Sequence, residues 1–346
     1  MKKVMVPVVD KNNKPLMPTT CWRASKWIKS RKATPFWKHG IFCVRLNVEP
    51  SARNIQPIVV GIDPGSKREA FTVKSKKNTY LNILTHAVTW VKDAIKTRRS
   101  ARKRRKYRKT PYKKSKENRK RGNLPPSTKT RWQLKFRIIN KLIKIFPISQ
   151  FVIEDIKAKK KSGNKKWNSN FSPLETGKKW FYEELGKIAP VKLMQGWETC
   201  NLRNQLMLEK SCLKLTEEFS AHNVDSWVLA WSAVGGKEEP DNESLLIIVP
   251  LRFHRRQLHY LQFSKNGKRR PYGGTRSLGL KRGSLVDHSG YGLCYIGGTS
   301  KGMISLHSLV DGERICQKAK LEEIKFKCYS SFRFYRKEDI TDPFVA

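Results

Sequence analysis

The sequence IVVGIDPGS at residues 58–66 is the stretch that decides the fold. Its first five residues are apolar or glycine and rich in β-branched side chains, which is typical of a buried strand. Asp63 ends the run, and the Pro-Gly pair after it indicates a turn. A carboxylate at the end of a rigid buried strand suits a metal ligand, although an aspartate here could also cap the turn.

A second buried strand is predicted at residues 151–156 (FVIEDI), where Glu154 follows three apolar residues. The segments 71–73 and 80–88 predict two further strands joined by turns, which gives an antiparallel meander with the first strand. Apolar residues at helical spacing over 132–146 predict a packed helix before the second acid. Two strand-end carboxylates in one chain indicate that they meet.

A third acid lies in the sequence AHNVDSWVLAWSAV at residues 221–234, which predicts a helix ended by a Gly-Gly pair. His222 and Asp225 are three residues apart at its start, so both project from the same side. The helix dipole favours an acid there whatever its role. His222 could equally be a satisfied surface or capping histidine.

The order of these acids predicts a nuclease. Asp63 and Glu154 at strand ends, with Asp225 in the first turn of a helix, follow the order of a ribonuclease-H-like nuclease. Phosphodiester cleavage is served by two divalent ions held by converging carboxylates. Oxygen ligands favour Mg²⁺ over zinc, and Mn²⁺ could substitute. His222 could orient or deprotonate the attacking water.

Residues 96–121 form a basic block between the first two acids. They hold sixteen Lys or Arg residues and a single acid, Glu117. A helix that is polar on all sides is not held by a protein core, and such blocks neutralise phosphates. A disordered basic tail is the alternative, but this block lies inside the chain. A proline at 111 should end the helix near Lys109, with 112–121 as an extended basic arm.

The whole chain is strongly basic, with 346 residues and a formal net charge of +45. This charge predicts that the protein is normally bound to RNA or DNA, although a ribosomal or architectural protein would share this charge. The seven cysteines form no C-x-x-C pair, so we expect reduced thiols, no zinc site and a cytoplasmic location. No apolar run approaches the ~18 residues of a membrane span.

The remaining segments predict a small β-α-β unit within 1–50, including a basic helix capped by Thr19 and Thr20 that continues to about Lys32. Its tryptophans Trp22, Trp27 and Trp37 could pack or stack on bases. Further elements are expected between the second and third acids, as helices over 173–187 and 198–208 and a strand over 191–194. The acidic segment 237–243 indicates a domain boundary, and the turn-rich residues 244–346 predict a small all-β barrel or sheet.

These segments resemble, nearly end to end, the split RuvC nuclease of the transposon-encoded, RNA-guided IscB/IsrB family. Departures at Glu69, Ala70 and Ser226 leave the three acids intact. The matching motifs are PLMP at 15–18, VGIDPGS at 60–66, the arginine-rich 98–108, FVIED at 151–155, HNVD at 222–225 and RRPYGG at 269–274.

The resemblance implies an α/β fold in which a ribonuclease-H-like (RuvC) core is split by an arginine-rich bridge helix. The expected parts are a PLMP domain (1–56), RuvC segment I (57–90), the bridge helix (91–122), RuvC segments II and III (123–236), and a β-rich domain that contacts the target-adjacent motif (244–346). The larger branch of the family inserts an HNH nuclease, which needs histidine, between segments II and III. No histidine lies between Glu154 and His222, so the resemblance is to the HNH-lacking IsrB branch.

The resemblance further implies a Mg²⁺-dependent nickase that cuts the non-target strand. Its partners would be a guide (omega) RNA and double-stranded target DNA, with the protein monomeric in a prokaryotic ribonucleoprotein. A guide-RNA-bound DNA-binding protein without nuclease activity and an RNA-independent junction-type nuclease are the alternatives. The expected RNA-binding residues are Arg98, Arg99, Arg102, Arg104, Arg105 and Arg108, and the expected DNA-binding residues are Gln257, Arg269, Arg270 and Arg276.

Overall fold

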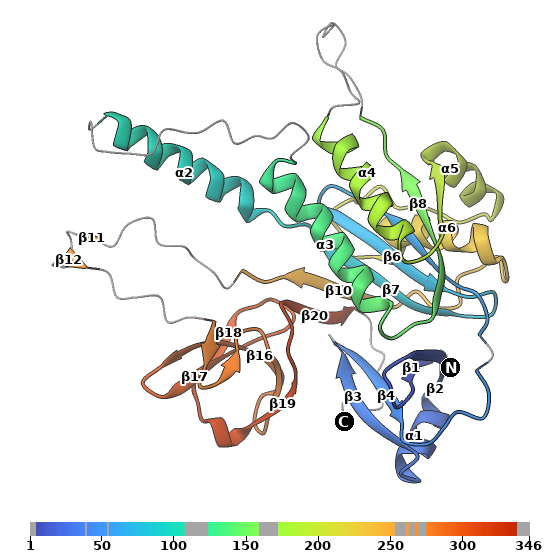
Figure 1. Cartoon of the computed structure of the whole chain (residues 1–346), viewed down its shortest axis with the longest axis horizontal. Helices are drawn as coiled ribbons and strands as arrows, with labels where there is room; N and C mark the ends of the chain where they lie inside the picture. The colour runs from blue at the N-terminus through green and yellow to red at the C-terminus, as the bar shows by residue number, and fades with distance from the viewer. Residues whose placement is uncertain are drawn as a thin grey trace, which may run out of the picture.

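A seven-stranded mixed sheet lies at the centre of the computed structural model (Figure 1). The structure describes residues 5–38, 40–53, 55–107, 124–158, 172–252, 261–262, 267–268 and 275–337. The strands in sheet order are β20 (Phe332–Lys337), β10 (Leu245–Pro250), β7 (Thr79–His86), β6 (Arg68–Lys74), β5 (Ile58–Asp63), β8 (Ile148–Asp155) and β9 (Val191–Gln195).

The pairing directions identify the fold. Strands β5, β6 and β7 form the expected antiparallel meander. Strand β8 then pairs parallel with β5, and β9 pairs parallel with β8. An antiparallel meander continued by parallel strands on the side of its first strand is the ribonuclease-H-like arrangement, so the predicted fold class is confirmed.

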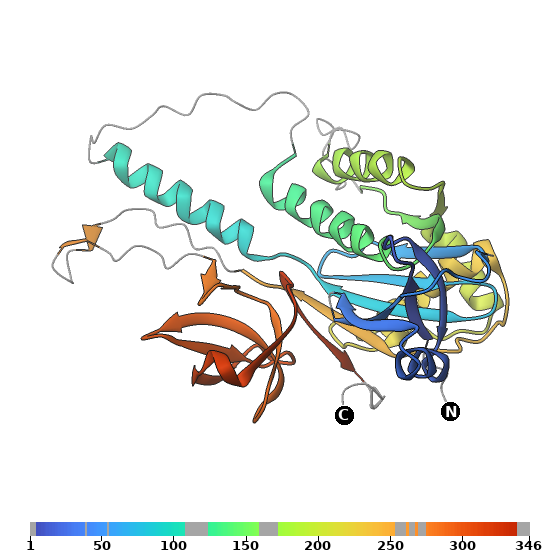
Figure 2. The ribbon, with the colours of Figure 1, turned by 60° about the horizontal axis from the view of Figure 1, so that its bottom comes forward.

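Alternation along β5 sorts its side chains onto two faces of the sheet. Val60 and Ile62 join the core beneath α3 (Pro126–Leu142) and α4 (Pro173–Gly186). Val59 packs on the opposite face against α6 (Val224–Val234). Gly61 lies on that second face too, where a Cβ would lie 1.9 Å from the Ser226 carbonyl oxygen. Helices therefore cover both faces (Figure 2), and Asp63 points to the α6 side.

Helices α3 and α5 begin and end earlier than predicted, whereas α4 begins at the predicted residue. α3 begins six residues before the expected 132 because Pro126 is well placed in a first helical turn, where its missing N–H is not needed. α4 begins after Ser172, whose side chain accepts a hydrogen bond from the Glu175 backbone N–H. α5 spans Gly196–Gln205. A π-helical turn, Phe219–Asn223, precedes α6, which ends at Gly235 with φ +61°.

The arginine-rich helix α2 (Trp90–Tyr107) extends away from the central sheet (Figure 1). Trp90 and Val91 at its start pack against the main core, whereas the residues from Lys96 onward are exposed or partly exposed where their side chains are described. The expected helix end near Lys109 and the arm over 112–121 lie outside the described residues.

The amino-terminal unit is a four-stranded sheet with one helix. Its order is β2 (Pro15–Thr20), β1 (Met5–Val9), β4 (Ile41–Leu46) and β3 (Ala33–Lys38), with α1 (Cys21–Lys29) between β2 and β3. Thr20 caps α1 by accepting a hydrogen bond from the Arg23 backbone N–H, as predicted, but the helix ends at Lys29 instead of Lys32. Trp27 and Trp37 pack in the core, whereas Trp22 is 71% exposed.

The segment 237–243 does not separate the carboxy-terminal residues from the nuclease sheet. β10 pairs parallel with β7, and β20 closes that edge by pairing antiparallel with β10. Between them lies a five-stranded antiparallel sheet, β18 (Arg314–Ala319), β17 (Met303–His307), β16 (Gly292–Ser300), β15 (Leu285–His288) and β19 (Ile324–Cys328), with a 3₁₀ turn at Leu321–Glu323. The short strands are β11 (Leu261–Gln262), β12 (Gly267–Lys268), β13 (Arg276–Ser277) and β14 (Leu280–Lys281).

No helix in the described part of the chain combines the length and apolar character needed to cross a membrane.

Candidate metal centre

The structure brings together the three acids that the sequence singled out. Each of Asp63, Glu154 and Asp225 offers one oxygen, and these oxygens lie within 4.8 Å of one another. Strand alternation explains why these acids meet. Asp63 on β5 and Glu154 on β8 lie on the same face of the sheet as the residues of their strands that pack against α6. Asp225 comes from the first turn of α6 itself. The α6 face at the ends of β5 and β8 therefore carries a carboxylate cluster.

The next residue on β8, Asp155, points away from this cluster. Its carboxylate pairs with Lys178 at 2.9 Å and accepts hydrogen bonds from Tyr182 and Gln195. These partners hold the pKa of Asp155 below its usual range, even though burial acts to raise it. Of the two acids at the end of β8, only Glu154 is available to the cluster.

The electrostatics of the cluster indicate that it fits a cation. Burial, with the neighbouring Glu154 and Asp225 carboxylates, raises the pKa of Asp63 to about 7. Burial and the charge of Asp225 also raise the pKa of Glu154. Crowded carboxylates resist ionising together unless positive charge is supplied. Three hard oxygen donors suit Mg²⁺ or Mn²⁺ better than zinc.

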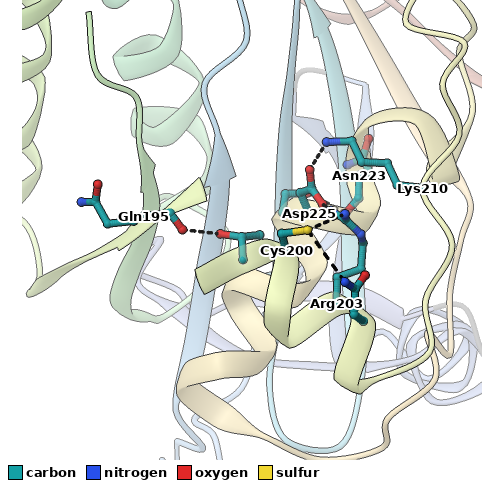
Figure 3. Close-up of polar contacts among 9 residues, drawn as sticks. Gln195, Cys200, Arg203, Lys210, Asn223 and Asp225 are labelled. Carbon is teal, nitrogen blue, oxygen red and sulfur yellow. Dashed lines mark hydrogen bonds and ion pairs between the residues drawn. The ribbon is translucent and has the colours of Figure 1, made fainter. Parts of the chain in front are cut away.

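Two basic side chains that no sequence motif marks reach the cluster. Arg203 on α5 donates from Nη1 to Asp225 Oδ1 at 2.6 Å, and Lys210 donates from Nζ to Asp225 Oδ2 (Figure 3). Arg203 also donates from Nη2 to the Cys200 sulfur at 3.4 Å, which fixes its guanidinium on the helix. Lys210 comes from the irregular segment between α5 and the π-helical turn, so no periodic pattern marks it.

The start of α5 lies directly against the cluster. A Cβ on Gly196, its first residue, would lie 2.7 Å from Glu154 Oε1. Glu198 accepts a hydrogen bond from the Gln195 backbone N–H at 2.5 Å, which fixes this first turn. The absence of a side chain at Gly196 therefore leaves the space that the Glu154 carboxylate occupies.

His222 is not part of the carboxylate cluster. It lies in the π-helical turn before α6, and its Nε2 is buried without a hydrogen-bond partner among the residues that the structure describes. Burial and the nearby charge of Arg68 lower the pKa of His222, which favours the neutral ring. A neutral imidazole can accept a proton, so its role towards the attacking water stays a prediction.

The predicted nucleic-acid contacts are only partly within the described chain. Arg98, Arg99, Arg102 and Arg104 have exposed side chains on α2. Arg276 is exposed, and its Nη1 donates to the Gly279 carbonyl oxygen at 2.8 Å across a tight turn. Arg108, Gln257, Arg269, Arg270 and the side chain of Arg105 lie outside the described residues.

Comparisons with known proteins give limited matches. A comparison with curated proteins found no match. The structure of T. thermophilus RuvC in complex with Holliday junction substrate is 12% identical with a TM-score of 0.28, and the match covers 52% of this chain and 97% of that chain. The yeast mitochondrial Holliday junction resolvase is 15% identical with a TM-score of 0.26, covering 51% and 78%. With TM-scores this low, the fold assignment rests on the strand order described above.

The family comparison covers the amino-terminal part of the chain. It includes α2 and the strands that carry Asp63 and Glu154. Residues 6–167 of this chain match the family model of the RRXRR protein.

Proposed function

We propose that this protein is an RNA-guided DNA nickase with a RuvC-type active site. The observation that carries the proposal is the convergence of Asp63, Glu154 and Asp225 on one face of a ribonuclease-H-like sheet. Each of the three carboxylates offers an oxygen within 4.8 Å of the others. Such a cluster costs stability through mutual repulsion, which divalent cation binding would relieve.

The reaction would be hydrolysis of one phosphodiester bond. The oxygen of a water molecule forms a bond to phosphorus, the bond from phosphorus to the leaving sugar oxygen breaks, and that oxygen takes up a proton. A bound divalent ion would activate the water and neutralise charge on the phosphate. Asp63, Glu154 and Asp225 would hold the ion, and Arg203 would keep the Asp225 carboxylate in place. His222 would take the proton of the attacking water.

The guide RNA part of the proposal rests on charge and on α2. The chain carries a net charge of +45, and α2 presents Arg98, Arg99, Arg102 and Arg104 to solvent away from the sheet. Arginines aligned on one exposed helix suit the phosphates of a structured RNA. Guide pairing would then supply sequence specificity, while the protein reads backbone shape and a short flanking motif. The resemblance to the IscB/IsrB family and the RRXRR match support this reading.

The nickase part follows from the number of centres. In the described part of the chain, the acids at 63, 154 and 225 form a single group of metal-ligand type. One centre of this kind cuts one strand, and the displaced non-target strand is the one we propose. The two-ion form expected from the sequence stays a prediction.

The test is a nicking assay on the purified ribonucleoprotein. Wild-type protein with its copurified RNA should nick one strand of a matched supercoiled DNA in Mg²⁺ or Mn²⁺, and should leave a mismatched DNA intact. Asp63→Asn should abolish nicking and retain DNA binding. Asp311→Asn, which changes an exposed acid far from the cluster in sequence, serves as the control.

Each negative result has a defined meaning. Nicking by Asp63→Asn would contradict the assigned centre. Binding without nicking by the wild type would favour the DNA-binding alternative, and RNA-independent cutting of branched DNA would favour the junction nuclease. Replacing Arg98, Arg99 and Arg102 together by alanine should reduce RNA binding and guided nicking in parallel, and guided nicking without RNA binding would refute the role of α2.

A further inference from the structure

The segment 211–218 leads into the π-helical turn that holds His222, and it forms neither helix nor strand. Its base is closed by the Ser211 backbone N–H, which donates to the Ser220 carbonyl oxygen at 3.1 Å. This bond shapes the segment but does not fasten it to the nuclease sheet. The place of the segment on the sheet therefore depends on the contacts that it makes with the strands.

Glu217 fastens the segment to three strands of the sheet. His86 on β7 brings its Nε2 to 2.7 Å from Glu217 Oε1, and Tyr335 on β20 donates from its hydroxyl to Glu217 Oε2 at 2.8 Å. Arg68 on β6 places its Nη2 at 3.6 Å from Oε1. The Glu217 side chain is only 19% exposed, so these contacts are largely shielded from solvent.

These contacts lie at the end of the sheet that carries the carboxylate cluster. Arg68 and His86 are partners at the end of the β6–β7 pair, and Ala70, two residues along β6, pairs with Asp63 on β5. Arg68 also donates from Nη2 to the Leu215 carbonyl oxygen at 3.4 Å. The segment is therefore held at two points beside the strands that lead to the cluster.

The held segment lies against His222. Burial and the charge of Arg68 lower the pKa of His222, whereas the backbone groups of Lys214 and Thr216 act to raise it, which requires that they lie close to the ring. The His222 Nε2 atom is buried. The position of the segment therefore determines where the His222 ring can lie.

We propose that Glu217 is a positioning residue that holds His222 in place for the attacking water. This inference rests on the proposed function, because His222 is the residue that would take the proton of that water. Glu217 acts through the backbone of 211–218 and does not touch the reacting atoms. Through Tyr335, the strand β20 becomes part of the support of the histidine.

Hydrogen–deuterium exchange tests the proposal without relying on activity. The full chain with its copurified RNA is measured by mass spectrometry in metal-free buffer. Glu217→Ala should speed exchange of the backbone amides over 211–218 by on the order of tenfold, because the segment opens more often. The carbon-bound hydrogen of the His222 ring should also exchange faster, while the amides of α6 keep their wild-type rates.

Three further variants show which contact matters. Glu217→Gln keeps an oxygen for the Tyr335 hydroxyl and should restore wild-type exchange. Tyr335→Phe removes one contact from a different strand and should loosen 211–218 to a smaller extent. Glu218→Ala is the matched control, because it changes the neighbouring exposed acid, and it should leave exchange over 211–218 unchanged.

Nicking rates then show whether Glu217 acts through His222. Removing a general base costs about 100-fold or more, and displacing one costs on the order of 10- to 100-fold. Glu217→Ala should therefore nick DNA 10- to 100-fold more slowly, with unchanged Mn²⁺ affinity. In a His222→Ala background the same substitution should cost less than about twofold, because the residue that it positions is gone. If Glu217→Ala does not fold, Tyr335→Phe is used in the same cycle.

Two outcomes would overturn the inference. Wild-type exchange over 211–218 and at the His222 ring in Glu217→Ala would show that Glu217 does not hold the segment. Losses that multiply in the double variant would show that Glu217 acts independently of His222. Failure of the proposed function is distinct, since a wild type that cuts no DNA, with faster exchange in Glu217→Ala, would refute the nuclease and leave the support of His222 by Glu217 intact.

Discussion

Substituting Gly196 by alanine tests whether Glu154 is a metal ligand. The new Cβ would lie 2.7 Å from Glu154 Oε1, and ordinary van der Waals contact begins at 3.4 Å. The carboxylate must therefore move by about 0.7 Å, the gap that remains to normal contact. The clash involves the far end of a flexible side chain, and Gly196 begins a helix without a positive φ. The fold should accept the change while the cluster does not.

The expected size of the effect follows from that displacement. A misplacement near 1 Å costs on the order of 100-fold in a catalytic site. A shift of about 0.7 Å at one of three ligands should weaken Mn²⁺ binding by roughly 10- to 100-fold, or about 1.4–2.7 kcal/mol. The free energy of unfolding without metal should change by less than about 1 kcal/mol, because no backbone group is displaced.

The assay pairs Mn²⁺ calorimetry with urea denaturation in metal-free buffer. Gly186→Ala is the matched control, since Gly186 ends α4 and a Cβ there would meet nothing within 4 Å. It should bind Mn²⁺ and nick DNA as the wild type does. If Gly196→Ala also binds Mn²⁺ and nicks normally, Glu154 is not a ligand and the assignment of the centre is wrong.

Three further predictions concern the acid chemistry and the packing around the centre. Lys135→Met should cost about 3–5 kcal/mol in urea denaturation, because it leaves the fully buried Glu69, now paired at 2.6 Å, without its cation; adding Glu69→Gln should recover most of the loss, and no recovery would contradict the pairing. Mn²⁺ affinity should rise about tenfold per pH unit up to about 7 and then level off, because the ion competes with the proton that Asp63 holds below its raised pKa; a flat calorimetric profile from pH 5.5 to 7 would contradict this. Gly61→Ala should lower the melting temperature by many degrees, because its Cβ would lie 1.9 Å from the Ser226 oxygen; an unchanged melting temperature would contradict the close packing of α6 on β5.

The sequence predicted the three acids because each lies at a regular element with a clear pattern. Asp63 and Glu154 end apolar strands, and Asp225 begins a helix with one apolar face. The period of two along a strand then decides which face an acid joins. Glu154 and Asp155 therefore point to opposite faces of β8, and Asp155 pairs with Lys178 on α4 at 2.9 Å.

The cations of the centre could not be found in this way. Arg203 lies among polar neighbours on α5, and Lys210 belongs to a segment without helix or strand. In a chain with 73 Lys or Arg residues, the sequence does not distinguish the basic residues of the site from the others. Arg203 and Lys210 reach Asp225 only because α5 and the segment after it lie next to α6 in the folded chain. A carboxylate pattern is local, whereas the cations that complete it come from tertiary structure.

The carboxy-terminal boundary was misjudged for a related reason. The acidic composition of 237–243 resembles a linker, yet both Asp241 oxygens accept from the Thr79 backbone N–H at 3.1 and 2.9 Å. Asn82 donates to the Asn242 carbonyl oxygen at 2.7 Å. These bonds fasten the segment along β7, and β10 then enters the sheet beside it.

The seven-stranded sheet contains both β5, which carries Asp63, and β10, which leads into the carboxy-terminal strands. β7 lies two strands from β5, which ends in Asp63, and β10 pairs directly with β7. The five-stranded carboxy-terminal sheet is held between β10 and β20, so it is inserted into the nuclease sheet rather than tethered to it. A nucleic acid bound by the carboxy-terminal strands would therefore contact a part of the chain that is joined to β10 and β20 of the nuclease sheet, and not a part attached through a flexible linker. The connection between the carboxy-terminal strands and β5 therefore runs through neighbouring, hydrogen-bonded strands of one sheet.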